Sequence, residues 1–238
     1  MIRSVCLSLI LIVSFANLRC TDHSVSPREK PGAVRLIPHG SDWDWIERGI
    51  DADSDMDGIF LEWHSPAEDD IAYCDIYRSD DPLKDFETVA RVYMPDTSFV
   101  DTGVSFHHRF FYYAVAVNEE GRQSVPSDTL FYTLLEKANL LAPKGTIDTV
   151  KPVFSWRDPN LAFTVILKVI QAATETPVWM AGVDNHGGDE TMETVYNFDG
   201  SASIPELERN TAYLWRIDVV GNQTNSGSET PWTSFTIR

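Results

Sequence analysis

The residues best suited to hold a metal ion form the acidic stretch 51–58, which reads DADSDMDG. It contains the D-x-D-x-D-G opening of a calcium loop, in which carboxylates at positions one, three and five bind the ion, here Asp53, Asp55 and Asp57. Such a loop also needs a bidentate glutamate at position twelve, and that position is His64. We therefore predict a hairpin turn in which Asp and Gly supply the turn geometry, with weak calcium binding by the three aspartates as the alternative.

Motifs of the common catalytic centres do not occur in the sequence. There is no G-x-S-x-G elbow, no H-E-x-x-H zinc motif and no phosphate-binding G-x-x-x-x-G-K loop. His107 and His108 are adjacent, so on a strand they would point to opposite faces and could not easily share one metal ion. The HGGDE segment at 186–190 has no accompanying nucleophile, and we interpret it as a hairpin connection. We assign no catalytic residue and no cofactor beyond weak calcium. We expect a non-enzymatic protein, with a hydrolase that uses an unrecognised site as one alternative.

Four tryptophans lie outside the alternating pattern of the strands: Trp43, Trp45, Trp179 and Trp232. Exposed tryptophans can stack on sugar rings, so a carbohydrate-binding or enzyme-accessory module is a second alternative. Packing is the competing interpretation, in which Trp43 and Trp45 cover the base of the first domain. Exposure of Trp43, Trp45 and Trp179 in one plane would favour the carbohydrate alternative.

Short runs of alternating apolar residues, such as IFLEW at 59–63, follow one another through the chain. Turn-forming segments separate these runs at intervals of roughly 8–12 residues, which is typical of an antiparallel sandwich or barrel. The pattern breaks at EKAN, 136–139, and a second, similar set of runs follows. We therefore predict an all-β chain with sandwiches at 33–135 and 140–238, joined by the linker 136–139.

These runs carry residues that resemble the fibronectin type III family. In the first half they are I-x-L-x-W at 59–63, IYRS at 76–79, YAVAVN at 113–118 and SVPSD at 124–128. In the second half they are FSW at 154–156, YLWRI at 213–217 and the closing WTSFTI at 232–237. The resemblance implies two tandem immunoglobulin-like (fibronectin type III) antiparallel β-sandwiches, and a role in adhesion, spacing or protein binding. The region 171–206 departs from the pattern.

Alternation within the strands predicts which side chains are buried, because facing sheets bury every second residue. In the first sandwich these are Trp63, Ile76, Tyr113, Val115 and Val117. In the second sandwich they are Phe154, Trp156, Val165, Leu167, Tyr213, Trp215 and Ile217. Cys74 shares the parity of Ile76, so we predict a small core residue and not a reactive thiol.

The first twenty residues, 1–20, have the pattern of an export signal. Arg3 supplies a positive n-region, and 4–16 forms an apolar run that is too short to span a bilayer. Small residues ahead of Asn17 suit a signal peptidase, which would make Asn17 the first residue of the mature chain. The sequence therefore predicts that the protein leaves the cytoplasm.

Cys20 offers a second fate for the exported chain. A cysteine at this distance from the N-terminus resembles the lipid-modified cysteine of bacterial lipoproteins, although Arg19 stands where their lipobox prefers a small residue. Cleavage ahead of Asn17 and lipid attachment at Cys20 both stay open. Either fate predicts an extracytoplasmic protein that is secreted, periplasmic or lipid-anchored at the cell surface. Residues 21–32 are polar, carry two prolines and are predicted to form a flexible spacer.

The net charge of the chain limits the classes of partner that it is expected to bind. The 238 residues include 36 acidic and 19 basic side chains, a net charge of −17. Nucleic acid and anionic lipid heads both need lysine and arginine, so neither is expected as a partner, and a membrane is reached only through a lipid at Cys20. We expect a protein or glycan partner at the cell envelope. Of the three cysteines, only Cys74 lies outside the export region, so an internal disulfide is excluded.

Overall fold

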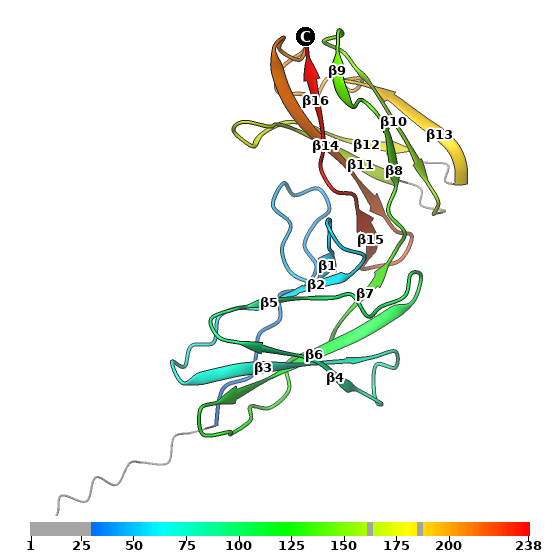
Figure 1. Ribbon diagram of the computed structural model, residues 1–238. Helices are drawn as coiled ribbons and strands as arrows, with labels where there is room; N and C mark the ends of the chain where they lie inside the picture. The colour runs from blue at the N-terminus through cyan, green and yellow to red at the C-terminus, as the bar shows by residue number, and fades with distance from the viewer. Residues whose placement is uncertain (1–29, 161–163, 185–187) are drawn as a thin grey trace, which may run out of the picture.

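Two β-sandwiches lie end to end in the computed structural model (Figure 1). The structure describes residues 30–160, 164–184 and 188–238. The predicted export signal, Cys20 and nearly all of the predicted spacer lie outside the described residues, as does the start of the HGGDE segment. The described part of the chain holds no helix that is long and apolar enough to cross a membrane.

The first sandwich consists of strands β1 to β7. Their bounds are β1 Asp51–Ala52, β2 Ile59–Glu62, β3 Ile71–Ser79, β4 Glu87–Tyr93, β5 Ser98–Asp101, β6 Arg109–Asn118 and β7 Leu130–Leu134. The sheet β1-β2-β5 packs against the sheet β4-β3-β6-β7, and neighbouring strands within each are antiparallel. Residues 53–58 form the turn of the β1–β2 hairpin, in which Asp51 pairs with Phe60.

The second sandwich consists of strands β8 to β16. Their bounds are β8 Asn139–Ala142, β9 Gly145–Ile147, β10 Val153–Asp158, β11 Thr164–Gln171, β12 Thr176–Asp184, β13 Gly188–Val195, β14 Thr211–Val220, β15 Ser226–Glu229 and β16 Thr233–Ile237. The sheet β8-β10-β13 packs against a sheet in which β12, β11 and β14 are followed by β15 and β16, and β9 pairs parallel with β16. Each sandwich thus sets a three-stranded sheet against a larger one. The predicted fold class, all-β with two tandem sandwiches, is confirmed.

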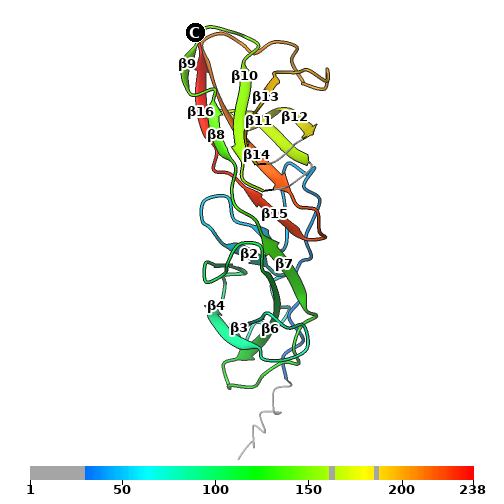
Figure 2. The same ribbon diagram turned by 90° about the vertical axis from the view of Figure 1, so that its right-hand side faces the viewer.

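A parallel strand pair joins the two sandwiches. Ser226 and Gly227 of β15 pair with two residues of β7, Thr133 and Leu134, and the larger sheets become one ten-stranded sheet. In Figure 2, β7 and β15 run side by side across the junction. Because β8 begins at Asn139, this residue belongs to the second sandwich and not to the predicted linker, 136–139.

The core of the second sandwich agrees with the prediction from alternation. All seven predicted residues are buried in one cluster between the two sheets. Their strands, including TVILKVIQ of β11 and TAYLWRIDVV of β14, are rich in β-branched and aromatic residues, which fit a pleated, buried surface. β12 and β13 occupy much of the region 171–206, and Trp179 of β12 joins the core with 1% of its surface exposed.

In the first sandwich the prediction for β6 is wrong by one residue. Alternation predicts Tyr113, Val115 and Val117 in the core. The core instead contains their neighbours Tyr112, Ala114 and Ala116. Val115 and Val117 are buried on the opposite, outer face of the sheet, where Tyr113 stacks on Tyr77 with ring centroids 4.7 Å apart.

The error has a physical cause. The β6 sequence RFFYYAVAVN is apolar at both parities, so a period of two does not indicate which face is buried. The neighbouring strand β3 determines which face of β6 is buried, because Ile76 lies in the core and pairs with Ala114. Trp63 and Cys74 also lie in this core. Those three core predictions are confirmed, and burial raises the pKa of the Cys74 thiol to about 11.

Within the segment WIERGIDA, 45–52, the residues ahead of β1 form a loop. Only Asp51–Ala52 of that segment is extended. The amide of Ile50 donates to the carbonyl oxygen of Ile37 at 3.0 Å and closes the base of a loop over 38–50, which we call the junction loop. Figure 1 shows this loop, in blue, beside β1 and next to the second sandwich.

Candidate functional site at the junction

The junction loop, 38–50, extends from the first sandwich onto the second. Trp43 lies over Gly182 of β12, where an added Cβ would come within 2.6 Å of the indole ring. The missing side chain at Gly182 therefore permits this close contact. Trp43 remains 54% exposed. The packing interpretation puts Trp43 over the base of the first sandwich, whereas its contact at Gly182 is with the second sandwich.

Five charged side chains form a buried network between the junction loop and the second sandwich. They are Glu47 of the loop, Lys168 of β11, Arg216 and Asp218 of β14, and Glu229 of β15. Lys168 is 1% exposed, and its ammonium pairs with Glu47 and, at 2.9 Å, with Asp218. Guanidinium nitrogens of Arg216 lie 2.7 Å from an oxygen of Glu47 and 2.8 Å from one of Glu229.

Strand geometry places these charges on the outer face of β11 and β14. Lys168 and Arg216 are direct partners across the two strands, and their neighbours Leu167 and Ile217 point into the core. Successive side chains of a strand alternate between faces, so the charged residues point away from the core. Glu47 of the junction loop meets them on that face, which keeps the charges out of water.

The network holds two cations and three carboxyl groups, so its charge balances when one carboxyl is protonated. Burial and the hydrogen bond with Glu47 raise the pKa of Glu229 far above its usual range. Burial alone would also raise the pKa of Glu47, but the hydrogen bond with Glu229 and the charges of Arg216 and Lys168 lower it. The hydrogen-bonded pair Glu47 and Glu229 therefore shares one proton at neutral pH.

A second polar cluster fixes the base of the junction loop. The hydroxyl of Tyr132, on β7, donates to Oδ1 of Asp51 at 2.8 Å. Ring nitrogens of His39 lie 3.3 Å from Oδ2 of Asp51 and 3.4 Å from Oδ1 of Asp42. Hydrogen bonds to Asp42 and Asp51 raise the pKa of His39 to about 10, against the effect of burial. His39 is therefore a cation at neutral pH and ties the loop to β1.

Lys137 joins the β1–β2 turn to the second sandwich. Its ammonium donates to the carbonyl oxygens of Asp53, of Ser54 at 3.1 Å and of Glu229 at 2.9 Å. Burial lowers the pKa of Lys137, while the nearby carboxylates of Asp57 and Asp53 act in the opposite direction. One side chain thus bonds main-chain atoms of both sandwiches.

An acidic pocket of about 260 Å³ opens at the junction, with Trp45 and Trp232 among its lining residues. Oxygens of Glu47, Asp51 and Glu229 lie within 4.8 Å of one another, and in the described part of the chain they are the group that could share a metal ion. Each of these carboxyl groups already has a partner in the charged network or in the cluster around Tyr132. The protein itself therefore balances their charge.

The predicted calcium ligands do not belong to this group. Asp53, Asp55 and Asp57 lie in the turn 53–58, where Oδ1 of Asp53 accepts hydrogen bonds from the amides of Asp55 and Met56, at 3.0 and 2.7 Å. Such bonds from an aspartate to amides two and three positions on stabilise a turn. Weak calcium binding by the three aspartates stays a prediction.

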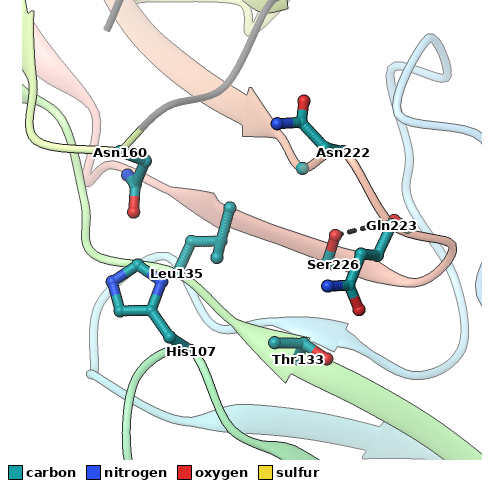
Figure 3. Close-up of a pocket in the computed structure, with 8 residues that line it drawn as sticks. His107, Thr133, Leu135, Asn160, Asn222, Gln223 and Ser226 are labelled. Carbon is teal, nitrogen blue, oxygen red and sulfur yellow. Dashed lines mark hydrogen bonds between the residues drawn. The ribbon is translucent and has the colours of Figure 1, made fainter. Parts of the chain in front are cut away.

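A second junction cavity, of about 180 Å³, lies beside the β7–β15 pair (Figure 3). The first sandwich contributes His107, Thr133 and Leu135 to its wall. The second sandwich contributes Asn160, Gly221, Asn222, Gln223 and Ser226. His107 and His108, just ahead of β6, are both exposed, and His107 extends to this cavity.

The tryptophans do not form a common exposed surface. Trp179 is buried in the second core, and its indole N–H donates to Asp199 at 2.9 Å. Trp43, Trp45 and Trp179 are therefore not exposed in one plane, and the condition that would favour the carbohydrate alternative is not met. Trp232 packs near Arg216, whose guanidinium carbon lies 5.1 Å from the ring centroid.

Sequence reasoning misses all five residues of the charged network, although three of them leave a signal. Lys168 interrupts the apolar strand TVILKVIQ, and Arg216 and Asp218 alternate with apolar residues in YLWRIDVV. A charge within such a strand is costly to bury unless it is paired, so it predicts a partner on the outer face. Nothing local identifies Glu47 as that partner.

No family model matches the chain, and no curated protein matches its sequence. Solved structures do match parts of it. An Fn3-like protein from Clostridium thermocellum is 18% identical, over 43% of this chain and 88% of that one, with a TM-score of 0.32. A two-domain fibronectin type III segment of chicken tenascin is 15% identical, over 87% of this chain and 97% of that one, with a TM-score of 0.30. A pectate lyase from Erwinia chrysanthemi is 19% identical, over 42% and 27%, with a TM-score of 0.33.

These TM-scores are too low to support an argument about the fold, which follows instead from the strand order. In each sandwich the first, second and fifth strands of the immunoglobulin-like order form one sheet, and the remaining strands form the larger one. The fold is fibronectin type III-like, as the resemblance in the sequence predicts.

Proposed function

We propose that the chain is a non-enzymatic, exported protein whose two fibronectin type III-like sandwiches act as one rigid spacer that presents binding surfaces at the cell envelope. The charged network at the junction carries the proposal. Two sandwiches on a short linker would ordinarily move relative to each other unless a substantial interface restrains them. Here ion pairs buried from water cross that interface.

Three separate sets of contacts hold the sandwiches together. The β7–β15 pair continues the main-chain hydrogen bonding from one sheet into the next. Glu47 inserts a carboxylate among the charges of the second sandwich. Lys137 bonds carbonyl oxygens on both sides. Buried ion pairs add little net stability compared with apolar contacts, but they are strongly directional, which supports a fixed orientation as their role.

The tumbling of the two sandwiches in solution tests whether they form one rigid unit. Backbone ¹⁵N relaxation of the full chain should give the same rotational correlation time for amides of both sandwiches. Lys168→Met should separate the two values, because it removes the cation shared by Glu47 and Asp218. Independent tumbling of the two sandwiches in the unaltered protein would rule out the spacer.

Export is a separate part of the proposal, supported by the pattern of residues 1–20. Mass spectrometry of the protein recovered from its native envelope distinguishes the two fates. A chain that begins at Asn17 indicates a released protein, and a diacylated or triacylated N-terminal Cys20 indicates a lipid anchor. A chain that retains Met1 in the cytoplasm would contradict export.

A hydrolase is the second candidate, because one observation favours it. The carboxyls of Glu47 and Glu229 form a hydrogen-bonded pair that is removed from water, and both line a pocket that also contains Trp45 and Trp232. Acid pairs with separated pKa values occur at catalytic sites and also in structural ion-pair networks. The pairing of both carboxyls with Arg216 favours the structural role. Turnover of aryl glycoside or ester substrates that disappears in Glu229→Gln would reverse this assignment.

A further inference from the structure

The cavity of Figure 3 differs in chemistry from the rest of the protein surface. Charged residues make up 23% of the chain, yet the eight residues that line this cavity include no Asp, Glu, Lys or Arg. The wall consists of amides, hydroxyls, one imidazole, one glycine and the apolar side chain of Leu135. Such a wall offers hydrogen bonds from uncharged groups, so it favours a neutral polar ligand over an ion.

One buried group in this wall has an unused hydrogen-bonding capacity. Thr133 is 6% exposed, and in the described part of the chain its Oγ1 has no hydrogen-bond partner. A buried hydroxyl without a partner has lost its hydrogen bonds to water and gained none in return, so native proteins rarely leave one unless water or a ligand satisfies it. Thr133 therefore points to an occupant of the cavity.

Gln223 adds a positioned donor to the same wall. Its Oε1 accepts a hydrogen bond from the guanidinium of Arg109 at 2.8 Å, which fixes the orientation of the amide. The amide nitrogen is then left to donate elsewhere. The Ser226 hydroxyl donates to the carbonyl oxygen of Gln223 at 2.7 Å and holds the main chain at this point (Figure 3). The donor is therefore set before any ligand arrives.

We propose that this cavity binds a single neutral sugar ring. The amide of Gln223 and the hydroxyl of Thr133 bond to ring hydroxyls, and the C–H face of the sugar packs on Leu135. At about 30 Å³ per water, the 180 Å³ cavity has the volume of about six waters, which suits one ring at the end of a glycan and not the interior of a chain. The inference goes beyond the spacer role but rests on it, because both sandwiches form the wall.

Ligand-observed NMR and calorimetry on the full chain test the proposal with neutral methyl glycosides of glucose, galactose, mannose, xylose and N-acetylglucosamine. At least one should bind with millimolar affinity. Thr133→Val and Gln223→Leu should each weaken that binding about five- to thirtyfold, the effect of losing about one to two kcal/mol of hydrogen bonding. The matched substitutions Thr102→Val and Gln123→Leu, at exposed positions away from the cavity, should leave it unchanged.

Thr133→Val has a second, independent readout. Replacing a hydroxyl that lacks a protein partner by a methyl group of the same shape should leave the unliganded protein as stable as before or slightly more stable. Loss of sugar binding in a variant that unfolds at an unchanged denaturant midpoint therefore reports on the cavity and not on folding.

Three results would overturn the proposal. They are no binding by any glycoside of the panel, binding that both cavity variants retain, and tighter binding of glucuronate or inorganic phosphate than of every neutral glycoside. The ¹⁵N relaxation of the same samples separates this failure from that of the spacer. If the sandwiches tumble together and no sugar binds, water alone fills the cavity and the spacer stands. If they tumble independently, the spacer itself fails.

Discussion

An oxygen of Glu47 lies 2.7 Å from a guanidinium nitrogen of Arg216, although the two residues are 169 positions apart and belong to different sandwiches. Both side chains are about nine-tenths buried. A carboxylate that the first sandwich alone would expose to solvent is thereby removed from water by the second. This ion pair therefore links the two sandwiches at a point separate from the linker that connects them in the sequence.

Removal of the buried cation should destabilise the protein strongly. Lys168→Met leaves Glu47 and Asp218 without the ammonium that they share, and breaking a buried ion pair costs about 3–5 kcal/mol. Denaturant unfolding, followed by tryptophan fluorescence, measures the loss. Lys151→Met is the matched control, because Lys151 pairs with Glu206 at 3.5 Å on the surface, and it should cost less than about 1 kcal/mol. Equal costs for the two variants would mean that the network is not a structural element.

Stability should fall as the pH rises above neutral. The pKa of His39 is about 10 in the folded protein and about 6.5 in the unfolded chain, so its contribution is complete below pH 6.5 and is lost as the pH rises toward 10. Glu229, with its raised pKa, acts in the same direction. His39→Gln should flatten the decline of the denaturant midpoint over this range, and the exposed-site variant His108→Gln should not. A decline of the same size in His39→Gln would show that other groups cause it.

The two central tryptophans should respond differently to phenylalanine. Trp215 donates its indole N–H to the carbonyl oxygen of Pro143 at 2.9 Å, whereas the indole nitrogen of Trp63 has no hydrogen-bond partner among the described residues. Substitution by alanine should cost about 3–5 kcal/mol at either position. Trp215→Phe should cost about 1 kcal/mol more than Trp63→Phe, because it also leaves a buried carbonyl unpaired. Chemical denaturation of the four variants checks the order, and the reverse order for the phenylalanine pair would refute it.

Calcium should bind weakly or not at all to the β1–β2 turn. Asp53 already accepts two main-chain hydrogen bonds, and Lys137 occupies the carbonyl oxygens of Asp53 and Ser54. Calorimetric titration of the chelator-treated chain should show millimolar affinity or no heat, because the bidentate glutamate of a tight loop is absent. Sub-micromolar binding that is lost in Asp55→Ala would contradict this expectation.

Sequence patterns predict the fold well where only one face of a strand is apolar. In β14 the charged residues Arg216 and Asp218 mark the outer face, and Tyr213, Trp215 and Ile217, which have the other parity, are core residues as predicted. In β6, both faces are apolar, so the same rule selects the wrong one for Tyr113. The difference arises because a period of two identifies the buried face only when one face is apolar and the other polar; it does not measure burial itself.

The candidate sites are less predictable, because they are built from contacts between distant segments. Glu47 reaches Lys168 only because residues 38–50 form a loop that extends to the second sandwich, which the sequence pattern of this segment does not reveal. The cavity beside Thr133 forms only when β7 and β15 pair across the junction. Both depend on how the two sandwiches meet, and no local spacing in either sandwich encodes that arrangement.

The distance between the two sandwiches tests the central claim most directly. Spin labels at Leu83→Cys and Glu193→Cys, both exposed, report on the first and second sandwich, and pulsed dipolar spectroscopy gives the distribution of their separation. Cys6 and Cys20 are replaced by serine, and the buried Cys74, with its raised thiol pKa, does not take the label. A single narrow distribution that broadens in Lys168→Met is the predicted result. A broad distribution in the chain that retains Lys168 would contradict the rigid junction.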